Sequence, residues 1–288
     1  MTGLTDANVL PTIGSKELIA GMALWLGIGP GDTVVYPRNA YPTYELGAAL
    51  VGATALASDD PAEWPASTKL VWLNSPGNPD GSVLSYTSLK AAVDRARELG
   101  AVIAGDECYA ELGWSPSYDG VATPCILDPR VIGDSRHGVV SVYSLSKQSN
   151  LAGYRAGFVA GCSEVIGQLL AVRKHAGLMP PAPVQQAMVT ALGDEAHVVA
   201  QKKLYRARRA RLAAALEGAG FRIDRSEAGL YLWATRGEDA WTTLEWLAEC
   251  GILAAPGTFY GADGAEHVRL ALTSTDERID AAVRRLSS

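Results

Sequence analysis

Short apolar runs alternate with longer helical runs along the first two-thirds of this 288-residue chain. Three of the apolar runs, LVWLN, AVIAG and VVSVY, are continuous and do not alternate with polar residues. Continuous runs are typical of strands buried on both faces, and parallel sheets are built from such strands. Strand–helix–strand repetition predicts helices on both faces of the sheet. The predicted fold is therefore α/β, with a mostly parallel, seven-stranded sheet.

The elements of this sheet are separated by turns rich in glycine and proline. The predicted strands span Val9–Ile13, Thr33–Pro37, Ala53–Ala57, Leu70–Asn74, Ala101–Gly105, Val139–Tyr143 and Ala156–Gly161. The helices predicted between them span Lys16–Leu26, Pro42–Val51 and Ser85–Leu99. Parallel sheets bind ligands at the carboxyl ends of their strands, so we expect the chemistry at that edge.

The pattern changes after the proline-rich turn AGLMPPAP, which a helix over Val184–Leu192 follows. The later elements are a long helix, an antiparallel strand pair, a helix, a strand and a final helix. They span Glu195–Gly220, Phe221–Asp224, Gly229–Thr235, Trp241–Cys250, His267–Leu272 and Asp276–Leu286. This order is α+β, so we predict a large domain over residues 1–190 and a smaller C-terminal domain over residues 191–288.

Composition excludes several classes of partner. The net charge is −6, from 25 basic and 31 acidic side chains, which argues against nucleic-acid binding. The longest apolar stretch, Leu18–Ile28, is far shorter than the roughly 20 residues of a membrane span. MTGLTDANVL lacks the pattern of a signal peptide. Four widely spaced cysteines fit a reducing cytoplasm, and we expect neither a disulfide scaffold nor a metal site. The basic run Lys202–Arg211 is expected to be a solvated helix face.

Polar motifs follow four of the predicted strands. NSPGNPDG, from Asn74 to Gly81, is either a simple turn or a site loop. Asp106 of the motif DECY either caps a helix or faces a cation in a pocket. Lys147 of the motif SLSK lies close to two hydroxyls and to Arg155, which favours an anion site over a surface lysine. GSKE, from Gly14 to Glu17, begins a helix, where either Ser15 caps the helix or the free N–H groups bind a phosphate.

The order and spacing of these motifs resemble one enzyme family. GSKE, NSPGNPDG, DECY, SLSKQSNLAGYRAGF and HVRLALT are similar to the motifs of fold-type I pyridoxal-phosphate enzymes of the class I/II aminotransferase family. The resemblance implies a homodimeric enzyme that uses pyridoxal 5′-phosphate to move an amino group from an amino acid to a 2-oxo acid. TIGSKEL, the lysine motif and DECYAELGW most resemble N-succinyldiaminopimelate aminotransferases of the actinobacterial type.

That closer resemblance implies N-succinyl-LL-diaminopimelate and 2-oxoglutarate as substrates, in lysine and diaminopimelate biosynthesis. Three alternatives stay open: an aminotransferase for aspartate or aromatic acids, a lyase or decarboxylase on the same scaffold, and a non-catalytic pyridoxal-phosphate-binding module. Arg173, Lys174 and the AGLMPPAP loop are candidates for binding the succinyl end, although a solvated face is the favoured interpretation of the two charges.

The resemblance also implies the roles of individual residues. Lys147 would attach the cofactor and move a proton between the substrate and the cofactor, and Asp106 would pair with the pyridinium nitrogen. Arg269 would bind the substrate α-carboxylate, unless it is a surface strand arginine. The other implied site residues are Asn78 and Tyr109 at the ring 3′ oxygen (Asn78 also near the substrate), Tyr41 on the ring face or in the core, and Ser144, Ser146, Arg155, Gly14, Ser15 and Lys16 around the phosphate.

The beginning of the sequence departs from the family. Members normally carry an N-terminal arm and a further segment before GSKE, which complete the small domain and lend a tyrosine to the phosphate site of the partner subunit. Met1 precedes the first predicted strand by only a few residues. We therefore expect the front of the small domain and this tyrosine to be missing, so that the activity of the 288 residues alone needs a test.

Overall fold

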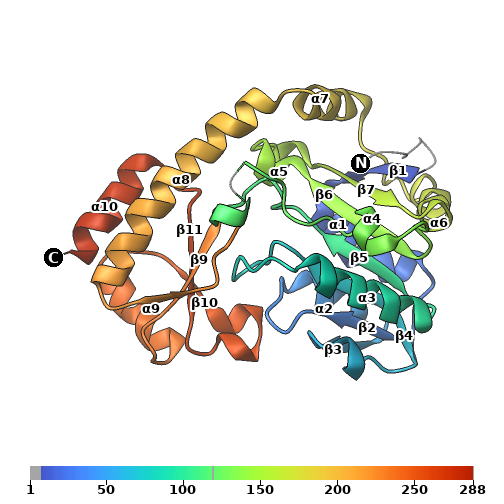
Figure 1. Cartoon of the computed structure of the whole chain (residues 1–288), viewed down its shortest axis with the longest axis horizontal. Helices are drawn as coiled ribbons and strands as arrows, with labels where there is room; N and C mark the ends of the chain where they lie inside the picture. The colour runs from blue at the N-terminus through green and yellow to red at the C-terminus, as the bar shows by residue number, and fades with distance from the viewer. Residues whose placement is uncertain (1–7, 119, 288) are drawn as a thin grey trace.

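The computed structural model describes residues 8–118 and 120–287. The first seven residues, in which the sequence predicts no signal peptide, lie outside this part. Within it, the strands form a seven-stranded and a four-stranded sheet, each with its own set of helices (Figure 1). None of the described helices is long and apolar enough to span a bilayer.

The larger sheet has the strand order β1-β7-β6-β5-β4-β2-β3. Its strands are β1 (Val9–Ile13), β2 (Thr33–Tyr36), β3 (Thr54–Ala57), β4 (Thr68–Asn74), β5 (Val102–Asp106), β6 (Val139–Ser144) and β7 (Ala156–Gly161). Strand β7 is antiparallel to both β1 and β6, and the other neighbours are parallel. The prediction of a mostly parallel, seven-stranded sheet is confirmed, and each strand begins and ends within two residues of its expected position.

Helices cover both faces of this sheet because its strands are apolar on both faces. In β4, Leu70 and Trp72 pack into one hydrophobic cluster, and Val71 packs into another on the opposite face. The first cluster includes α1 (Gly14–Trp25), α2 (Thr43–Ala49) and α6 (Ser163–Arg173). The second includes α3 (Tyr86–Glu98) and α4 (Pro129–Ile132) (Figure 1). Helices α4 and α6 were not predicted.

The second sheet is antiparallel throughout and has the order β10-β11-β9-β8. Its strands are β8 (Arg222–Asp224), β9 (Tyr231–Thr235), β10 (Ala255–Pro256) and β11 (Val268–Ala271). It shares a separate core with α8 (Glu195–Gly218), α9 (Ala240–Glu249) and α10 (Asp276–Leu286). The predicted antiparallel pair is confirmed, and β10 was not predicted. The domain boundary at residue 190 stays a prediction.

The remaining helical elements connect these parts. Helix α7 (Ala182–Leu192) joins the large sheet to α8 (Figure 1). Helix α5 (Leu145–Gln148) follows β6 directly. Short 3-10 helices span Pro61–Glu63, Pro116–Tyr118, Ala152–Tyr154, Gly257–Tyr260 and Ala262–Gly264.

The basic run on α8 is not fully solvated, contrary to the prediction from the sequence. The Arg208 Nε donates to Asp276 Oδ1 of α10 at 2.9 Å, and Arg208 is only 12% exposed. Arg211 also contacts Asp276, at 2.9 Å. Because α10 carries the acidic partners, part of this basic face fixes α10 onto α8.

Arg173 lies at the end of α6 and is fully buried, contrary to the expectation of a solvated charge. Its guanidinium donates to both carboxylate oxygens of Glu17, at 2.5 and 3.1 Å, and to the carbonyl of Leu178 at 2.9 Å. It also stacks on the Trp25 ring, 4.6 Å from the centroid. Arg173 therefore joins α6 to α1, which assigns it a structural role.

Replacing Arg173 by alanine is expected to lower the free energy of unfolding by about 3–5 kcal/mol, because the Glu17 carboxylate loses its partner inside the protein. Lys90→Ala provides the control, since Lys90 and Asp94 form an exposed pair that contributes less than about 1 kcal/mol. Urea unfolding of both variants measures the difference. Equal costs for the two substitutions would contradict a structural role for the buried pair.

Candidate active site

The predicted site residues meet at the carboxyl edge of the large sheet. Asn74 and Asp106 are paired neighbours at the ends of β4 and β5. Strand β7 runs in the opposite direction, so that Arg155, which precedes it, comes to the same edge as Ser144. A cavity of about 460 Å³ opens there. It is lined by Ser15, Lys16, Tyr41, Asn78, Asp106, Tyr109, Ser144, Ser146, Lys147, Arg155 and Arg269 among others. Of the predicted set only Gly14 is not among the lining residues.

Lys147 reaches the cavity from the short helix α5, directly after β6. Ser144 ends the strand and caps α5, since its hydroxyl accepts a hydrogen bond from the Ser146 N–H at 3.2 Å. Lys147 is half-buried. Its position between a fixed strand end and a capped helix turn holds the amine at the cavity.

Asp106 is only 6% exposed and does not cap a helix. The Tyr44 hydroxyl donates to its Oδ2 at 2.8 Å, and the Cys108 N–H donates to its Oδ1 at 3.3 Å. Burial raises the pKa of Asp106, while the hydrogen bonds from Cys108 and Tyr44 and the Lys147 cation act against this rise. Tyr44 was not predicted as a site residue. It is fully buried against Trp72, as a core residue would be.

The next residue, Glu107, points into the sheet. Its carboxylate accepts hydrogen bonds from the Ile126 N–H at 2.5 Å and from the Ser141 hydroxyl at 2.8 Å. Burial raises the pKa of Glu107 to about 7. Glu107 does not line the cavity, so that of the two adjacent carboxylates only Asp106 faces the site.

The start of α1 forms a corner suited to an anion. The N-cap of α1 is Ile13, with no side-chain cap hydrogen bond, so the expectation that Ser15 caps the helix is wrong. The Ser15 hydroxyl accepts from the Cys108 thiol at 3.3 Å. Gly14 has φ +68°, and a Cβ there would lie 2.4 Å from Arg155 Nη2. Glycine thus lets the Arg155 guanidinium approach the N–H groups of the first turn of α1. The guanidinium and these N–H groups together attract anions.

The NSPGNPDG loop is both a turn and part of the site. The Asn74 side chain accepts from the Asn78 N–H at 2.8 Å and donates to the Asp106 carbonyl at 3.0 Å. This fixes the loop so that Asn78 is only 6% exposed. Asn78 Oδ1 accepts from Arg269 Nη1 at 2.8 Å, which links the two sheets across the cavity.

Arg269, on β11, is not a surface strand arginine. Its guanidinium carbon lies 3.8 Å from the centroid of the Tyr231 ring and 4.8 Å from that of Tyr260. Its Nε is buried and has no hydrogen-bond partner among the described residues. The two rings orient a cation that still has a free donor.

Aromatic residues complete the walls. Tyr41 is half-buried against the core and also lines the cavity, and its place on the cofactor ring face stays a prediction. The Tyr109 and Tyr231 hydroxyls lie 3.4 Å apart. Tyr231, Phe259, Tyr260 and Cys108 line the cavity but were not predicted, because apolar and aromatic residues near strands resemble core residues.

Comparison with known proteins places the chain in a family. The model of the family described as aminotransferase class I and II matches residues 2–286. The chain belongs to this family. It is 54% identical to the 4-dedimethylamino-4-oxo-anhydrotetracycline transaminase OxyQ of Streptomyces rimosus, over 97% of this chain and 77% of OxyQ. It is also 54% identical to a probable aminotransferase of Mycobacterium tuberculosis, over 100% of this chain and 68% of that protein.

Solved structures of aminotransferases have the same fold. The N-succinyldiaminopimelate aminotransferase from Mycobacterium tuberculosis superimposes with a TM-score of 0.87 at 28% identity, over 98% of this chain and 77% of the other. The protein is thus a pyridoxal-phosphate-dependent aminotransferase.

The cavity residues fit pyridoxal phosphate. Its aldehyde requires an amine, which Lys147 provides, and its pyridine nitrogen requires a buried carboxylate, which Asp106 provides. Its phosphate requires N–H and guanidinium donors, which the Gly14–Arg155 corner provides. When bound, the cofactor supplies a ring that accepts electrons from the bond broken in the substrate.

Proposed function

We propose that this aminotransferase transfers the amino group of an α-amino acid to a 2-oxo acid in the cavity at the carboxyl edge of the large sheet. The observation that carries the proposal is Arg269, which lines the same cavity as Lys147 and stacks on two tyrosine rings. Its buried Nε has no hydrogen-bond partner in the part of the chain that the structure describes. A guanidinium with a free donor is suited to a carboxylate, the group that all α-amino and 2-oxo acids share.

Each polar residue then has a role. Lys147 would hold the cofactor, and its free amine would move the proton at the substrate α-carbon. Asp106 would keep the cofactor ring nitrogen protonated, and Tyr44 orients the Asp106 carboxylate. Asn78 and Tyr109 would donate to the ring 3′ oxygen, and Tyr41 would cover the ring. The phosphate would be held by Ser144, Ser146, Arg155 and the backbone of Gly14, Ser15 and Lys16.

The favoured substrate pair is N-succinyl-LL-diaminopimelate and 2-oxoglutarate, in lysine and diaminopimelate biosynthesis. Both molecules carry a second carboxylate. The Lys16 amine supports this choice, because it lies at the cavity, 5.3 Å from the centroid of the Tyr41 ring, while the backbone of Lys16 serves the phosphate. The fold shared with an N-succinyldiaminopimelate aminotransferase adds support.

A second candidate is amino transfer to a ketone on a polycyclic acceptor. The 54% identity with OxyQ favours it, since the name of that protein describes such a substrate. Initial rates with N-succinyl-LL-diaminopimelate, LL-diaminopimelate, aspartate, phenylalanine and a 4-oxo-anhydrotetracycline separate the candidates. A higher kcat/KM for the succinylated donor than for the other substrates supports the first. A preference for the tetracycline ketone assigns the second.

We also propose that the protein is cytoplasmic and that it forms a homodimer. The four free thiols fit a reducing compartment. Two leucines on neighbouring helices are exposed: Leu24 of α1 at 62% and Leu46 of α2 at 50%. Exposed apolar side chains on adjacent helices favour an interface that a second copy of the chain would bury. A sedimentation coefficient of a monomer at micromolar concentration would contradict the dimer.

Replacing Arg269 by lysine is expected to raise the KM for amino donors by about 10–100-fold, because an ammonium group forms neither the paired carboxylate hydrogen bonds nor the same stacking. Arg222→Lys is the matched control, since Arg222 is an exposed arginine paired with Asp224 in the same sheet. Steady-state kinetics measure both. An unchanged KM in Arg269→Lys would show that the carboxylate binds elsewhere.

A further inference from the structure

A second cluster of reactive side chains lies at the opposite edge of the large sheet from Lys147. His137 precedes β6, Cys162 follows β7, and Glu164 is in the first turn of α6. Strands β6 and β7 are paired so that Val140 lies opposite Gly161, and the Cys162 N–H donates to the Val139 carbonyl at 2.9 Å. The sheet thus fixes the backbone that carries His137 and Cys162, which are distant in sequence.

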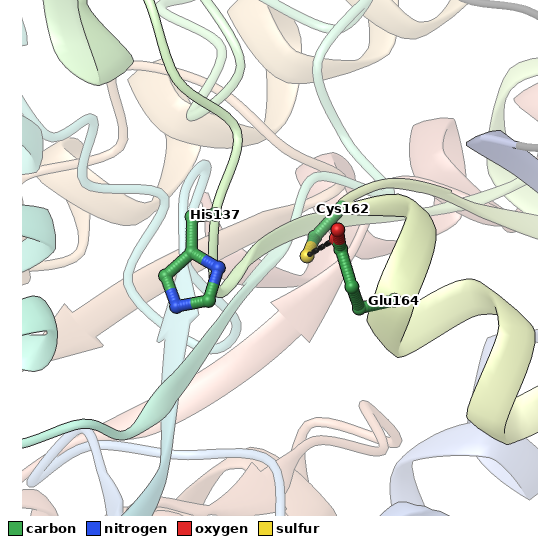
Figure 2. A group of neighbouring side chains, drawn as sticks. All are labelled: His137, Cys162 and Glu164. Carbon is green, nitrogen blue, oxygen red and sulfur yellow. Dashed lines mark hydrogen bonds between the residues drawn. The ribbon is translucent and has the colours of Figure 1, made fainter.

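The donor atoms of these three side chains point to one small volume. One imidazole nitrogen, the Cys162 sulfur and a Glu164 oxygen all lie within 4.8 Å of one another. The Cys162 thiol donates to Glu164 Oε2 at 3.0 Å, as the dashed line in Figure 2 shows. The His137 ring lies beside this pair, on the loop that leads into β6 (Figure 2). Among residues 8–118 and 120–287, this is the group of histidine, cysteine and acidic side chains whose donor atoms lie close enough together to hold a metal ion.

We propose that His137, Cys162 and Glu164 bind a divalent transition metal, with Zn²⁺ as the expected ion. Ligands of tetrahedral zinc lie about 3.5 Å apart, given bond lengths of about 2.0–2.3 Å. Donor atoms up to 4.8 Å apart therefore need to approach by about 1.3 Å at most, while the Cys162 sulfur and the Glu164 oxygen, 3.0 Å apart, separate slightly. The nitrogen, sulfur and oxygen donor set suits zinc and disfavours magnesium or calcium, which require oxygen ligands.

The surroundings leave room for the remaining coordination position. The three residues line a cavity of about 520 Å³, in which water can serve as the fourth ligand. Asp128, Asp134 and Arg136 line the same cavity, and the Asp128 carboxylate pairs with Arg130 at 2.8 Å. Metal binding replaces the proton of the Cys162 thiol, which passes to solvent, and the Glu164 carboxylate then faces the ion in place of the thiol hydrogen.

The consequence is a staple at the amino edge of the β6–β7 pair. The ion connects the loop before β6 to the start of α6, two segments that the pairing of β6 with β7 already brings together. Because Lys147 lies at the other edge, this binding is independent of amino transfer.

Calorimetric titration with Zn²⁺ tests the proposal. The sample is tag-free protein that carries its cofactor and has been freed of metal by a chelator. We expect one equivalent per chain, with binding at least about tenfold weaker in Cys162→Ser and in Glu164→Gln. Cys250→Ser and Asp134→Asn are the matched controls, a thiol outside the cluster and a carboxylate in the same cavity, and both should bind as the unaltered protein does.

Titration with Co²⁺ gives a readout that a purely structural role of Cys162 would not give. Difference spectra against the metal-free protein should contain a thiolate-to-cobalt charge-transfer band, which disappears in Cys162→Ser and persists in Cys250→Ser. Failure to bind one equivalent of Zn²⁺ would overturn the proposal. So would binding that is the same in both cluster variants and in the controls, since the ion would then be bound elsewhere.

Discussion

Replacing Lys147 by alanine is expected to reduce the rate of amino transfer by about 10⁴-fold or more. The amine both holds the cofactor and moves the proton at the substrate α-carbon, and a positioned proton-transfer group alone contributes about 10²–10⁴-fold. Alanine removes both contributions but leaves α5 intact, because Ser144 caps that helix from outside it. The loss is thus expected in rate and in covalent attachment, with little change in folding.

Coupled assays of 2-oxo acid formation measure the rate. Mass spectrometry after borohydride reduction locates the cofactor, which should stay on the peptide with Lys147 in the unaltered protein and on no peptide in the variant. Lys174→Ala is the control, since Lys174 is an exposed lysine outside the cavity. A Lys147 variant that keeps more than a tenth of the rate would refute the assignment.

Asp106→Asn is expected to lower kcat by about 10²–10³-fold while the cofactor stays bound. The substitution keeps the shape of the side chain and removes the negative charge that a protonated ring nitrogen needs, and the loss of one preorganised electrostatic partner has an effect of this size. The single oxygen of the asparagine can still accept from the Tyr44 hydroxyl, which lies 2.8 Å from Asp106 Oδ2. Only the longer hydrogen bond from the Cys108 N–H, 3.3 Å, is lost, so the fold should persist.

Visible absorbance of the bound cofactor and steady-state kinetics test this expectation together. The variant should retain the cofactor through Lys147 and the phosphate site, and should lose kcat with little change in KM. Asp263→Asn, an exposed carboxylate outside the cavity, serves as the control. A kcat within threefold of the unaltered protein would assign the ring nitrogen to another partner.

The strands and the polar residues at their ends were predictable from the sequence for a physical reason. Continuous apolar runs such as that of β4 require burial on both faces, and a charged residue such as Asp106 directly after one needs a partner. A functional site at the strand ends is therefore visible in the sequence as polar residues that directly follow apolar runs. Asp106 and Lys147 both line the cavity, as that logic predicted, whereas the role of Asn78 was implied only by the family resemblance.

Features that depend on distant partners were not predictable. The charge of the buried Arg173 is neutralised by Glu17, which is 156 residues away in the sequence. Tyr231 and Tyr260 enclose Arg269 through a fold in which β9 and the segment after β10 come together. Helix α6 contains Gly167, which lowers helix propensity, and its docking on the sheet through Val165 and Leu169 outweighs that cost.

The central claim is that nitrogen moves from an amino acid to a 2-oxo acid in the cavity of this chain. The most direct measurement incubates the 288-residue protein and pyridoxal phosphate with ¹⁵N-labelled glutamate and an unlabelled 2-oxo acid. We predict that the labelled nitrogen appears in the new amino acid, at one atom per molecule, and that Lys147→Ala prevents this transfer. Label that stays in glutamate or is released as ammonia would contradict the account.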